Sequence, residues 1–213
     1  MRDLGKLREE YAAAGLSETA APDAPWELFA GWLDDAVASG LHEPNAMVVA
    51  TATPESVPSS RMVLLKGFSP DGFVFFTNYQ SRKAVELAAN PAVALLFPWH
   101  PLQRQVRVEG TSAPLSDAES GAYFATRPRD SQVGAWASPQ SRVVASRDVL
   151  DAAYDEARER FEGTEVPRPP YWGGYLVTAT MVEFWQGRPG RMHDRLRFRR
   201  TEGGGWSVDR LAP

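Results

Sequence analysis

The chain has 213 residues, no cysteine and a net charge of −4, from 23 Lys and Arg against 27 Asp and Glu. That length suffices for one large or two small domains with a real core. The lack of cysteine excludes disulfides, thiolate metal sites and a cysteine nucleophile, and the mild acidity argues against bulk nucleic-acid binding. No apolar run is long enough to span a bilayer, and the charged N-terminus lacks the apolar core of a signal peptide, so we expect no membrane contact and a cytoplasmic location.

The first forty residues are predicted to be helical, and we treat 1–40 as an N-terminal segment and 41–213 as the main domain. Pro25 suits the first turn of a helix, and Gly40 is a plausible stop. The apolar residues between them fall near one helical stripe. They are Trp26, Leu28, Phe29, Trp32, Leu33 and Val37.

Short β-rich runs follow, at 46–51, 63–65, 73–76, 93–97 and 105–109. The Ser69-Pro70-Asp71-Gly72 turn predicts a hairpin between the second and third of them. Residues 81–90 predict a helix that begins after Ser81 as its N-cap.

The second half of the chain begins with a capping box at Ser116 and Glu119, which opens a helix that ends near Arg127. A longer amphipathic helix is predicted from about Ser146, and the proline-rich segment 166–170 is predicted to be a loop. Further strands are expected at 175–180, 181–185, 196–200 and 206–208. Six to eight short strands joined mostly by hairpin-scale loops predict a mainly β fold, a single antiparallel barrel decorated by peripheral helices.

The common catalytic motifs are absent: we find no Walker loop, GxGxxG, GxSxG or HExxH. His42, His100 and His193 are too scattered in sequence to indicate a metal site. The remaining candidates for chemistry are four clusters of positive charge.

The first two clusters lie in the N-terminal half. Arg61 and Lys66 flank an apolar run, which fits a strand with solvated ends. Residues five apart face opposite sides of a regular strand, so a bulge or two ligand sites would be needed to bring them together. Arg82 and Lys83 lie in the first turn after Ser81, where the helix dipole disfavours cations. A phosphate would resolve this conflict, and a solvated surface pair is an equally good interpretation.

The other two clusters lie in the C-terminal half. The segment Arg127–Gln132 follows a predicted helix that contains Tyr123. Arg, Ser and Tyr side chains together are typical of a phosphate-binding site. The alternative is a helix C-terminus that favours arginine. Residues 188–200 hold six arginines and His193, with Asp194 as the one acid. A basic hairpin, a nucleic-acid surface and a pocket for an anionic small molecule are all possible here, and the net charge favours the pocket over nucleic acid. Several such clusters without a nucleotide motif indicate more than one phosphorylated small ligand.

At these residues the chain resembles the pyridoxine (pyridoxamine) 5′-phosphate oxidase family, from about residue 8 to the C-terminus. Each matching stretch is weak alone, but their order and spacing together are specific. The stretches are Arg61–Lys66, Phe76–Asn78, Ser81–Lys83, Phe97–His100, Arg104–Val106, Arg127–Gln132, Gly134–Trp136, Gln140–Ser141, Trp172–Gly174, Glu183–Gly187, Arg191–Arg195 and Asp209–Pro213.

The resemblance implies an FMN-binding split barrel that acts as a homodimer, with FMN between the subunits. It implies oxidation of pyridoxine 5′-phosphate and pyridoxamine 5′-phosphate to pyridoxal 5′-phosphate, with O2 as acceptor and H2O2 as product. A split-barrel relative with another substrate, a non-catalytic flavin or pyridoxal phosphate carrier, and a nucleic-acid module remain as alternatives.

The resemblance also assigns roles to individual residues, and no metal ligand is among them. The FMN contacts it implies are Arg61, Met62, Val63, Leu64, Leu65, Lys66, Phe76, Thr77, Arg82, Lys83, Gln105, Gln140, Ser141, Trp185 and Arg195. The substrate phosphate would be held by Lys66, Tyr123, Arg127 and Ser131. Arg191 and His193 would lie over the pyridine ring near the oxidised carbon, as the catalytic pair. Arg8 and Tyr11 would belong to an N-terminal lid over the site.

Overall fold

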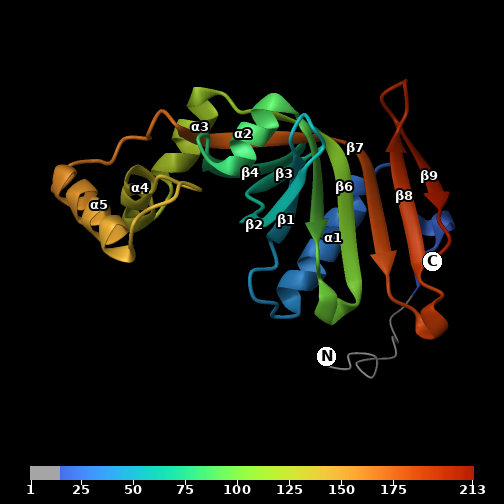
Figure 1. Ribbon diagram of the computed structural model, residues 1–213. Coiled ribbons are helices and arrows are strands. Elements are labelled where there is room, and N and C mark those ends of the chain that lie inside the picture. The colour runs from blue at the N-terminus through green and yellow to red at the C-terminus, as the bar shows by residue number, and fades with distance from the viewer. Residues whose placement is uncertain (1–14) are drawn as a thin grey trace, which may run out of the picture.

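The computed structural model describes residues 15–213, in which nine strands form one antiparallel sheet (Figure 1). The hydrogen-bonded order is β2-β1-β5-β6-β7-β4-β3, and β8 pairs with β7 and β9 with β8. The strands are β1 (Ala46–Ala52), β2 (Pro58–Leu64), β3 (Gly67–Ser69), β4 (Gly72–Asn78), β5 (Ala92–Phe97), β6 (Arg104–Pro114), β7 (Trp172–Gln186), β8 (Asp194–Arg200) and β9 (Trp206–Arg210). The predicted β-rich fold with peripheral helices is confirmed.

The 15-residue strand β7 divides the sheet into two parts. One edge of β7 pairs with β6, whereas the other edge pairs with β4 over residues 172–177 and with β8 over residues 181–186. Because β4 and β8 share one edge of the same strand, the sheet splits there into two branches. A bulge at Glu109/Gly110 bends β6, and Gly110 is required because a Cβ there would lie 2.1 Å from the carbonyl oxygen of Thr178.

Helix α1 (Pro25–Ala38) covers the core of the sheet with most of the stripe that the sequence predicts, but Val37 is exposed and Ala36 is buried in its place. The ring of Phe29 packs edge-on against Phe68, Phe73 and Phe97 at centroid distances of 4.8, 5.0 and 5.0 Å. The prediction of helix throughout 1–40 is too broad, because residues 15–24 contain only the 3-10 turn η1 (Glu18–Ala20).

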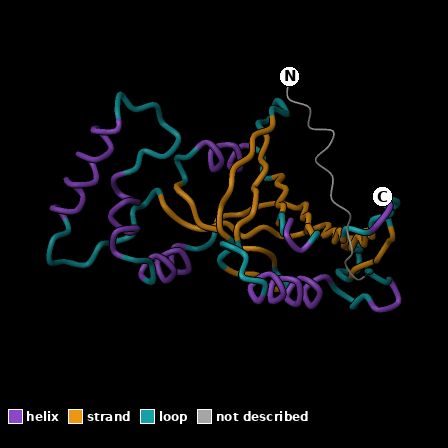
Figure 2. The backbone as a smooth tube through the Cα atoms, turned by 90° about the horizontal axis from the view of Figure 1, so that it is seen from below, coloured by secondary structure: helices purple, strands orange, loops and turns teal. Residues whose placement is uncertain are grey.

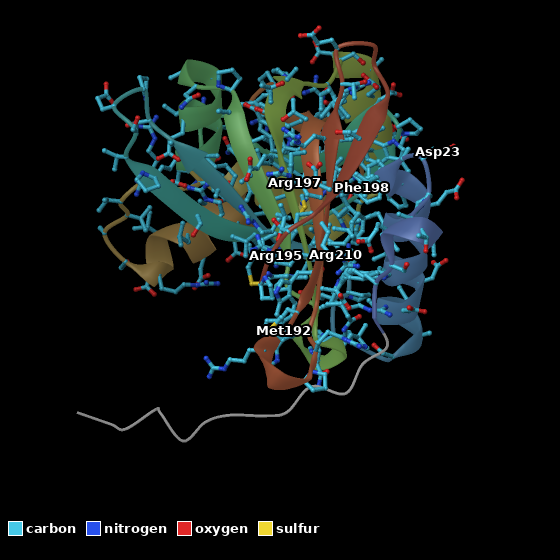
Figure 3. All side chains as sticks on the ribbon, turned by 90° about the vertical axis from the view of Figure 1, so that its right-hand side faces the viewer. Asp23, Met192, Arg195, Arg197, Phe198 and Arg210 are labelled. Atoms are coloured by element: carbon cyan, nitrogen blue, oxygen red, sulfur yellow. The ribbon has the colours of Figure 1, made fainter. Side chains whose placement is uncertain are left out.

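Three helices form a separate lobe with its own apolar cluster at one end of the molecule. They are α3 (Asp117–Ala125), α4 (Arg129–Ala137) and α5 (Arg147–Arg160). Figures 1 and 2 place this lobe at the end opposite β8 and β9. Figure 3 faces the β8–β9 end and labels Arg195 and Arg210 there.

The remaining helices are short: α2 (Arg82–Ala89), η2 (His100–Leu102) and η3 (Pro189–Arg191). The capping box at Ser116 and the N-cap position of Ser81 are both confirmed. Helix α4 was not predicted, because Pro128 looks like a terminator whereas it is the N-cap of the next helix. No helix within residues 15–213 is long and apolar enough to cross a membrane.

Two strand predictions are wrong in detail. The turn at 69–72 does form a hairpin, but the strand before it is β3, whereas residues 63–64 belong to β2 and pair with β1. The two strands expected at 175–180 and 181–185 are one continuous strand, β7. In both cases the partner strand, which lies elsewhere in the sequence, decides where a strand begins and ends.

Candidate active site

A cavity of about 280 Å³, here called the Lys83 pocket, lies where β2, β4, α2 and the start of β7 meet the helical lobe. It brings together residues from three of the four charged clusters and most of the FMN contacts expected in the first half of the chain. Its lining consists of Met62, Val63, Leu64, Lys66, Phe76, Thr77, Lys83, Tyr123, Arg127, Gln140 and Trp172.

Lys83 is a buried cation, 8% exposed, in the first turn of α2. Its Nζ donates hydrogen bonds to Gln140 Oε1 (2.8 Å), Thr77 Oγ1 (3.0 Å) and Ser81 Oγ (3.4 Å), all of which are neutral groups. Burial, and secondarily the charge of Arg61, lower the pKa of Lys83 from 10.5 to about 8. A buried ammonium with neutral partners favours an anionic ligand, since an anion would remove the desolvation penalty.

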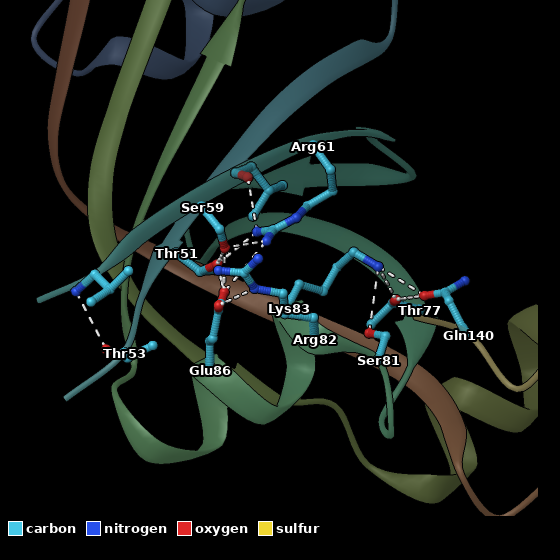
Figure 4. A network of polar contacts seen from close by, with 12 residues as sticks. Thr51, Thr53, Ser59, Arg61, Thr77, Ser81, Arg82, Lys83, Glu86 and Gln140 are labelled. Carbon is cyan, nitrogen blue, oxygen red and sulfur yellow. Dashed lines mark hydrogen bonds and ion pairs between the residues drawn. The ribbon is translucent and has the colours of Figure 1, made fainter. Parts of the chain in front are cut away.

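Beside Lys83, the buried carboxylate of Glu86 holds two arginines (Figure 4). Arg82 Nε donates to Glu86 Oε1 at 2.8 Å, and Arg61 Nη2 lies 3.4 Å from Glu86 Oε2. Burial opposes ionisation of Glu86, but hydrogen bonds from Ser59, Thr51 and Arg82 outweigh it and lower its pKa to about 2.

Glu86 therefore compensates part of the positive charge at the start of α2. Glu86 is not among the predicted site residues, although its spacing of four from Arg82 is a visible signal in the sequence. The strand alternation that separates Arg61 from Lys66 does not reach Lys66, because β2 ends at Leu64; Lys66 lines the pocket, and Arg61 is held beside it by Glu86.

The wall of the pocket toward the helical lobe is aromatic. The rings of Phe76 and Tyr123 stack at 3.9 Å and 13°, and Trp172 lies nearly parallel to both. Arg127, one turn after Tyr123, has a buried Nη1 for which the described part of the chain offers no acceptor, and burial lowers the pKa of its guanidinium. Ser131 lines an adjoining cavity of about 230 Å³ together with Arg127, so the predicted Tyr–Arg–Ser cluster is brought together.

A second group of expected residues lies on neighbouring strands in the other branch of the sheet. Gln105 in β6 and Arg195 in β8 are both directly opposite Trp185 in β7, and we call these three residues the Trp185 row. The ring of His193 lies 4.6 Å from that of Trp185, and its Nδ1 accepts a hydrogen bond from the backbone N–H of Arg188 at 3.1 Å. Arg191 is exposed at the end of η3, with a left-handed φ of 62°.

A buried acid organises this second group as well. Glu183 accepts hydrogen bonds from Arg195 Nε (2.8 Å) and Arg107 Nη1 (3.2 Å), and the contact with Glu183 raises the pKa of Arg195. Glu183 is only 2% exposed. The guanidinium of Arg195 is thereby held in one orientation beside Trp185.

The two groups do not meet within one chain. Trp172 is the first residue of β7 and belongs to the Lys83 pocket, whereas Trp185 is the next to last. With a rise of roughly 3.3 Å per residue, these two residues are on the order of 40 Å apart along the strand. The pocket and the Trp185 row are thus separate surfaces of the chain.

Two of the expected residues lie elsewhere, and two are outside the described part of the chain. Leu65 is buried in the main core, and Ser141 is exposed next to Gln140, with a left-handed φ of 69°. Arg8 and Tyr11 fall outside the described residues, so the predicted lid stays a prediction.

The residues present fit a phosphorylated aromatic ligand such as FMN. Lys83 is a buried cation without a carboxylate partner in residues 15–213, which suits the phosphate oxygens of FMN, and Arg127, also without one, offers the same chemistry to a second phosphate. The stacked rings supply a flat apolar wall, which suits a ring system.

Comparison with known proteins finds matches over most of the chain. The family model "Pyridoxamine 5′-phosphate oxidase" matches residues 33–161, and "Pyridoxine 5′-phosphate oxidase C-terminal dimerisation region" matches residues 172–213. The pyridoxine/pyridoxamine 5′-phosphate oxidase of Rubrobacter xylanophilus is 58% identical over 100% of this chain and 97% of its own length. That of a Nocardioides species is 59% identical over 99% and 98%.

Solved structures show the same fold. PhzG from Burkholderia lata, in complex with tetrahydrophenazine-1-carboxylic acid, matches with a TM-score of 0.89 and 29% identity, over 96% of this chain and 100% of that one. An FMN-binding protein related to pyridoxamine 5′-phosphate oxidase from Nostoc punctiforme matches with a TM-score of 0.72 at 18% identity, over 91% and 100%, and supports the fold alone. Together these matches show that the chain belongs to the pyridoxine/pyridoxamine 5′-phosphate oxidase family of FMN-dependent oxidoreductases.

Proposed function

We propose that two copies of this chain build each active site, in which FMN lies between the Lys83 pocket of one subunit and the Trp185 row of the other. The activity is that of the family, the FMN-dependent oxidation of pyridoxine 5′-phosphate and pyridoxamine 5′-phosphate to pyridoxal 5′-phosphate. The observation that carries the proposal is the separation of the two groups along β7, because a single chain cannot bring both to one flavin. The match of residues 172–213 to a dimerisation region supports it.

In this arrangement the phosphate of FMN binds at Lys83 and at the two arginines that Glu86 holds, Arg61 and Arg82. The flavin is lined on the same subunit by the pocket residues Met62, Val63, Leu64, Lys66, Phe76, Thr77 and Gln140. The partner subunit completes the flavin site with the Trp185 row. FMN held there would supply the two-electron oxidation, with O2 as the final electron acceptor and H2O2 as the product.

The substrate's phosphate binds at Lys66, Tyr123, Arg127 and Ser131, which meet at the pocket and the adjoining cavity. Arg191 and His193 come from the same subunit as the Trp185 row and cover the pyridine ring. Because Nδ1 of His193 accepts a backbone N–H, the neutral imidazole carries its proton on Nε2, the tautomer that donates to a polar ring substituent. The protein contributes orientation, by clamping two phosphates so that two rings stack in a reactive geometry.

Oxygen uptake by the purified protein with added FMN tests the function. We expect uptake and aldehyde formation with pyridoxine 5′-phosphate and far less with unphosphorylated pyridoxine. Bound flavin without oxygen uptake would favour a carrier, and uptake with an unrelated substrate would favour a relative of different specificity. Steeply salt-dependent binding to oligonucleotides would favour the nucleic-acid alternative.

A further inference from the structure

Trp172 forms part of the pocket wall, although neither the charged clusters nor the expected contacts include it. It is 6% exposed and lies nearly parallel to Phe76 (5.4 Å, 9°) and to Tyr123 (6.2 Å, 5°). Its ring therefore extends the stack formed by those two side chains. It also lines both the Lys83 pocket and the adjoining cavity, which are the two places where the substrate's phosphate is expected to bind.

The guanidinium of Arg127 lies over the face of the Trp172 ring. The guanidinium carbon of Arg127 lies 4.6 Å from the centroid of the Trp172 ring and 5.5 Å from that of Phe124. No ion pair with a carboxylate is found for Arg127 in residues 15–213, and its buried Nη1 has no acceptor there. The aromatic faces, rather than an acid, thus orient this guanidinium and leave its N–H groups available for an anion.

The position of Trp172 is itself well defined. Its backbone is paired opposite Asn78 of β4, and its carbonyl oxygen accepts a hydrogen bond from Arg168. The ring of Phe124 packs against it edge-on at 5.1 Å and 69°. A ring held from the backbone and from one edge offers a fixed surface to Arg127.

We propose that Trp172 is the positioning residue for the substrate's phosphate: its ring holds the Arg127 guanidinium and the Tyr123 ring in register to bind a phosphate dianion. The inference rests on the proposed function, because it takes the phosphate of pyridoxine 5′-phosphate as the anion. It assigns Trp172 to the binding of phosphorylated substrate and product, and not to the binding of FMN or to the chemical step.

The test compares Trp172→Leu, which removes the ring, with Trp172→Phe, which keeps a smaller one. For the leucine variant we expect the KM for pyridoxine 5′-phosphate and the Kd for pyridoxal 5′-phosphate to rise about tenfold, and for the phenylalanine variant about threefold. The contact between the substrate's phosphate and Arg127 is equally strong in the bound substrate and in the transition state. Its weakening therefore raises KM and leaves kcat within about twofold of wild type. The inhibition constant of inorganic phosphate rises in parallel, and the Kd for FMN, from flavin fluorescence, stays unchanged.

Trp136→Leu is the matched control, since Trp136 carries Arg160 at 4.8 Å in the same helical lobe but lies outside both cavities. Trp136→Leu should destabilise the helical lobe about as much as Trp172→Leu does, and it should leave the affinity for pyridoxal 5′-phosphate unchanged. Unchanged phosphate affinity in Trp172→Leu, or an equal loss in the control or in FMN affinity, overturns the inference. If Trp172→Leu does not fold, the same comparison is decided by Trp172→Phe. Wild-type protein that neither oxidises pyridoxine 5′-phosphate nor binds pyridoxal 5′-phosphate would instead contradict the proposed function.

Discussion

Replacing Lys83 by methionine removes a buried cation, and the consequence depends on pH. In the unfolded chain the lysine has a pKa of 10.5, whereas burial lowers it to about 8 in the folded FMN-free protein. Between these values the unfolded chain binds the proton and the folded protein does not, so raising the pH favours folding. Linkage gives a gain of about 2.5 kcal/mol in the free energy of unfolding between pH 7 and pH 10.

This gain should be present in the wild type and absent in Lys83→Met, so the difference between the two profiles isolates it. Denaturant unfolding of the FMN-free proteins at several pH values measures it. Lys66→Met is the control, because it removes an exposed lysine from the same pocket. Parallel wild-type and Lys83→Met profiles would refute the assignment of Lys83 as a buried cation.

The affinity for FMN should fall as the pH rises, whereas the stability of the FMN-free protein increases. A phosphate dianion beside Lys83 favours the charged lysine, so binding takes up a proton once the pH exceeds about 8. The affinity of the wild type should fall about tenfold between pH 7 and pH 9, and that of Lys83→Met should be weaker at pH 7 without this fall. Titration of flavin fluorescence measures both affinities. If wild type and Lys83→Met bind FMN equally tightly at pH 7, Lys83 does not contact the phosphate of FMN.

Three further predictions concern the other side chains of the site. Glu183→Gln should weaken FMN binding about tenfold by releasing Arg195, as flavin titration would show, and unchanged affinity would mean that Arg195 is oriented otherwise. Arg127→Ala should raise the KM for pyridoxine 5′-phosphate about thirtyfold without changing the Kd for FMN, since a charge-assisted contact is lost; an unchanged KM would remove it from the phosphate site. Arg191→Ala and His193→Ala should each raise KM and lower kcat with FMN still bound, and turnover equal to wild type in steady-state kinetics would sink both assignments.

The sequence predicts best where a site is built from neighbours along the chain. Tyr123, Arg127 and Ser131 are visible as one cluster because they belong to the end of one helix and the start of the next. The two cations after Ser81 are visible for the same reason, since they break the dipole rule within a single turn.

The pairing of strands that are distant in the sequence could not be predicted from local patterns. Gln105 lies opposite Trp185 because of the register between β6 and β7, which no local pattern encodes. The choice between β2 and β3 as the first arm of the hairpin is of the same kind, because the run 63–65 suits either strand. The family resemblance supplied the residues of the Trp185 row, and the register explains why they stand together.

The central claim, that each site is shared between two chains, can be measured by subunit complementation. Arg127→Ala damages the Lys83 pocket and Arg195→Ala damages the Trp185 row, so with FMN and substrate both held well below the concentrations that saturate the variants, each variant alone should be nearly inactive. A mixed dimer regains one intact site from the undamaged halves, so equal mixtures, refolded together, should recover about a quarter of wild-type oxidase activity. A mixture of Arg127→Ala with Lys66→Ala, both in the pocket, should recover none. If the first mixture stays as inactive as its components although mixed dimers form, each site lies within one chain and the account is wrong.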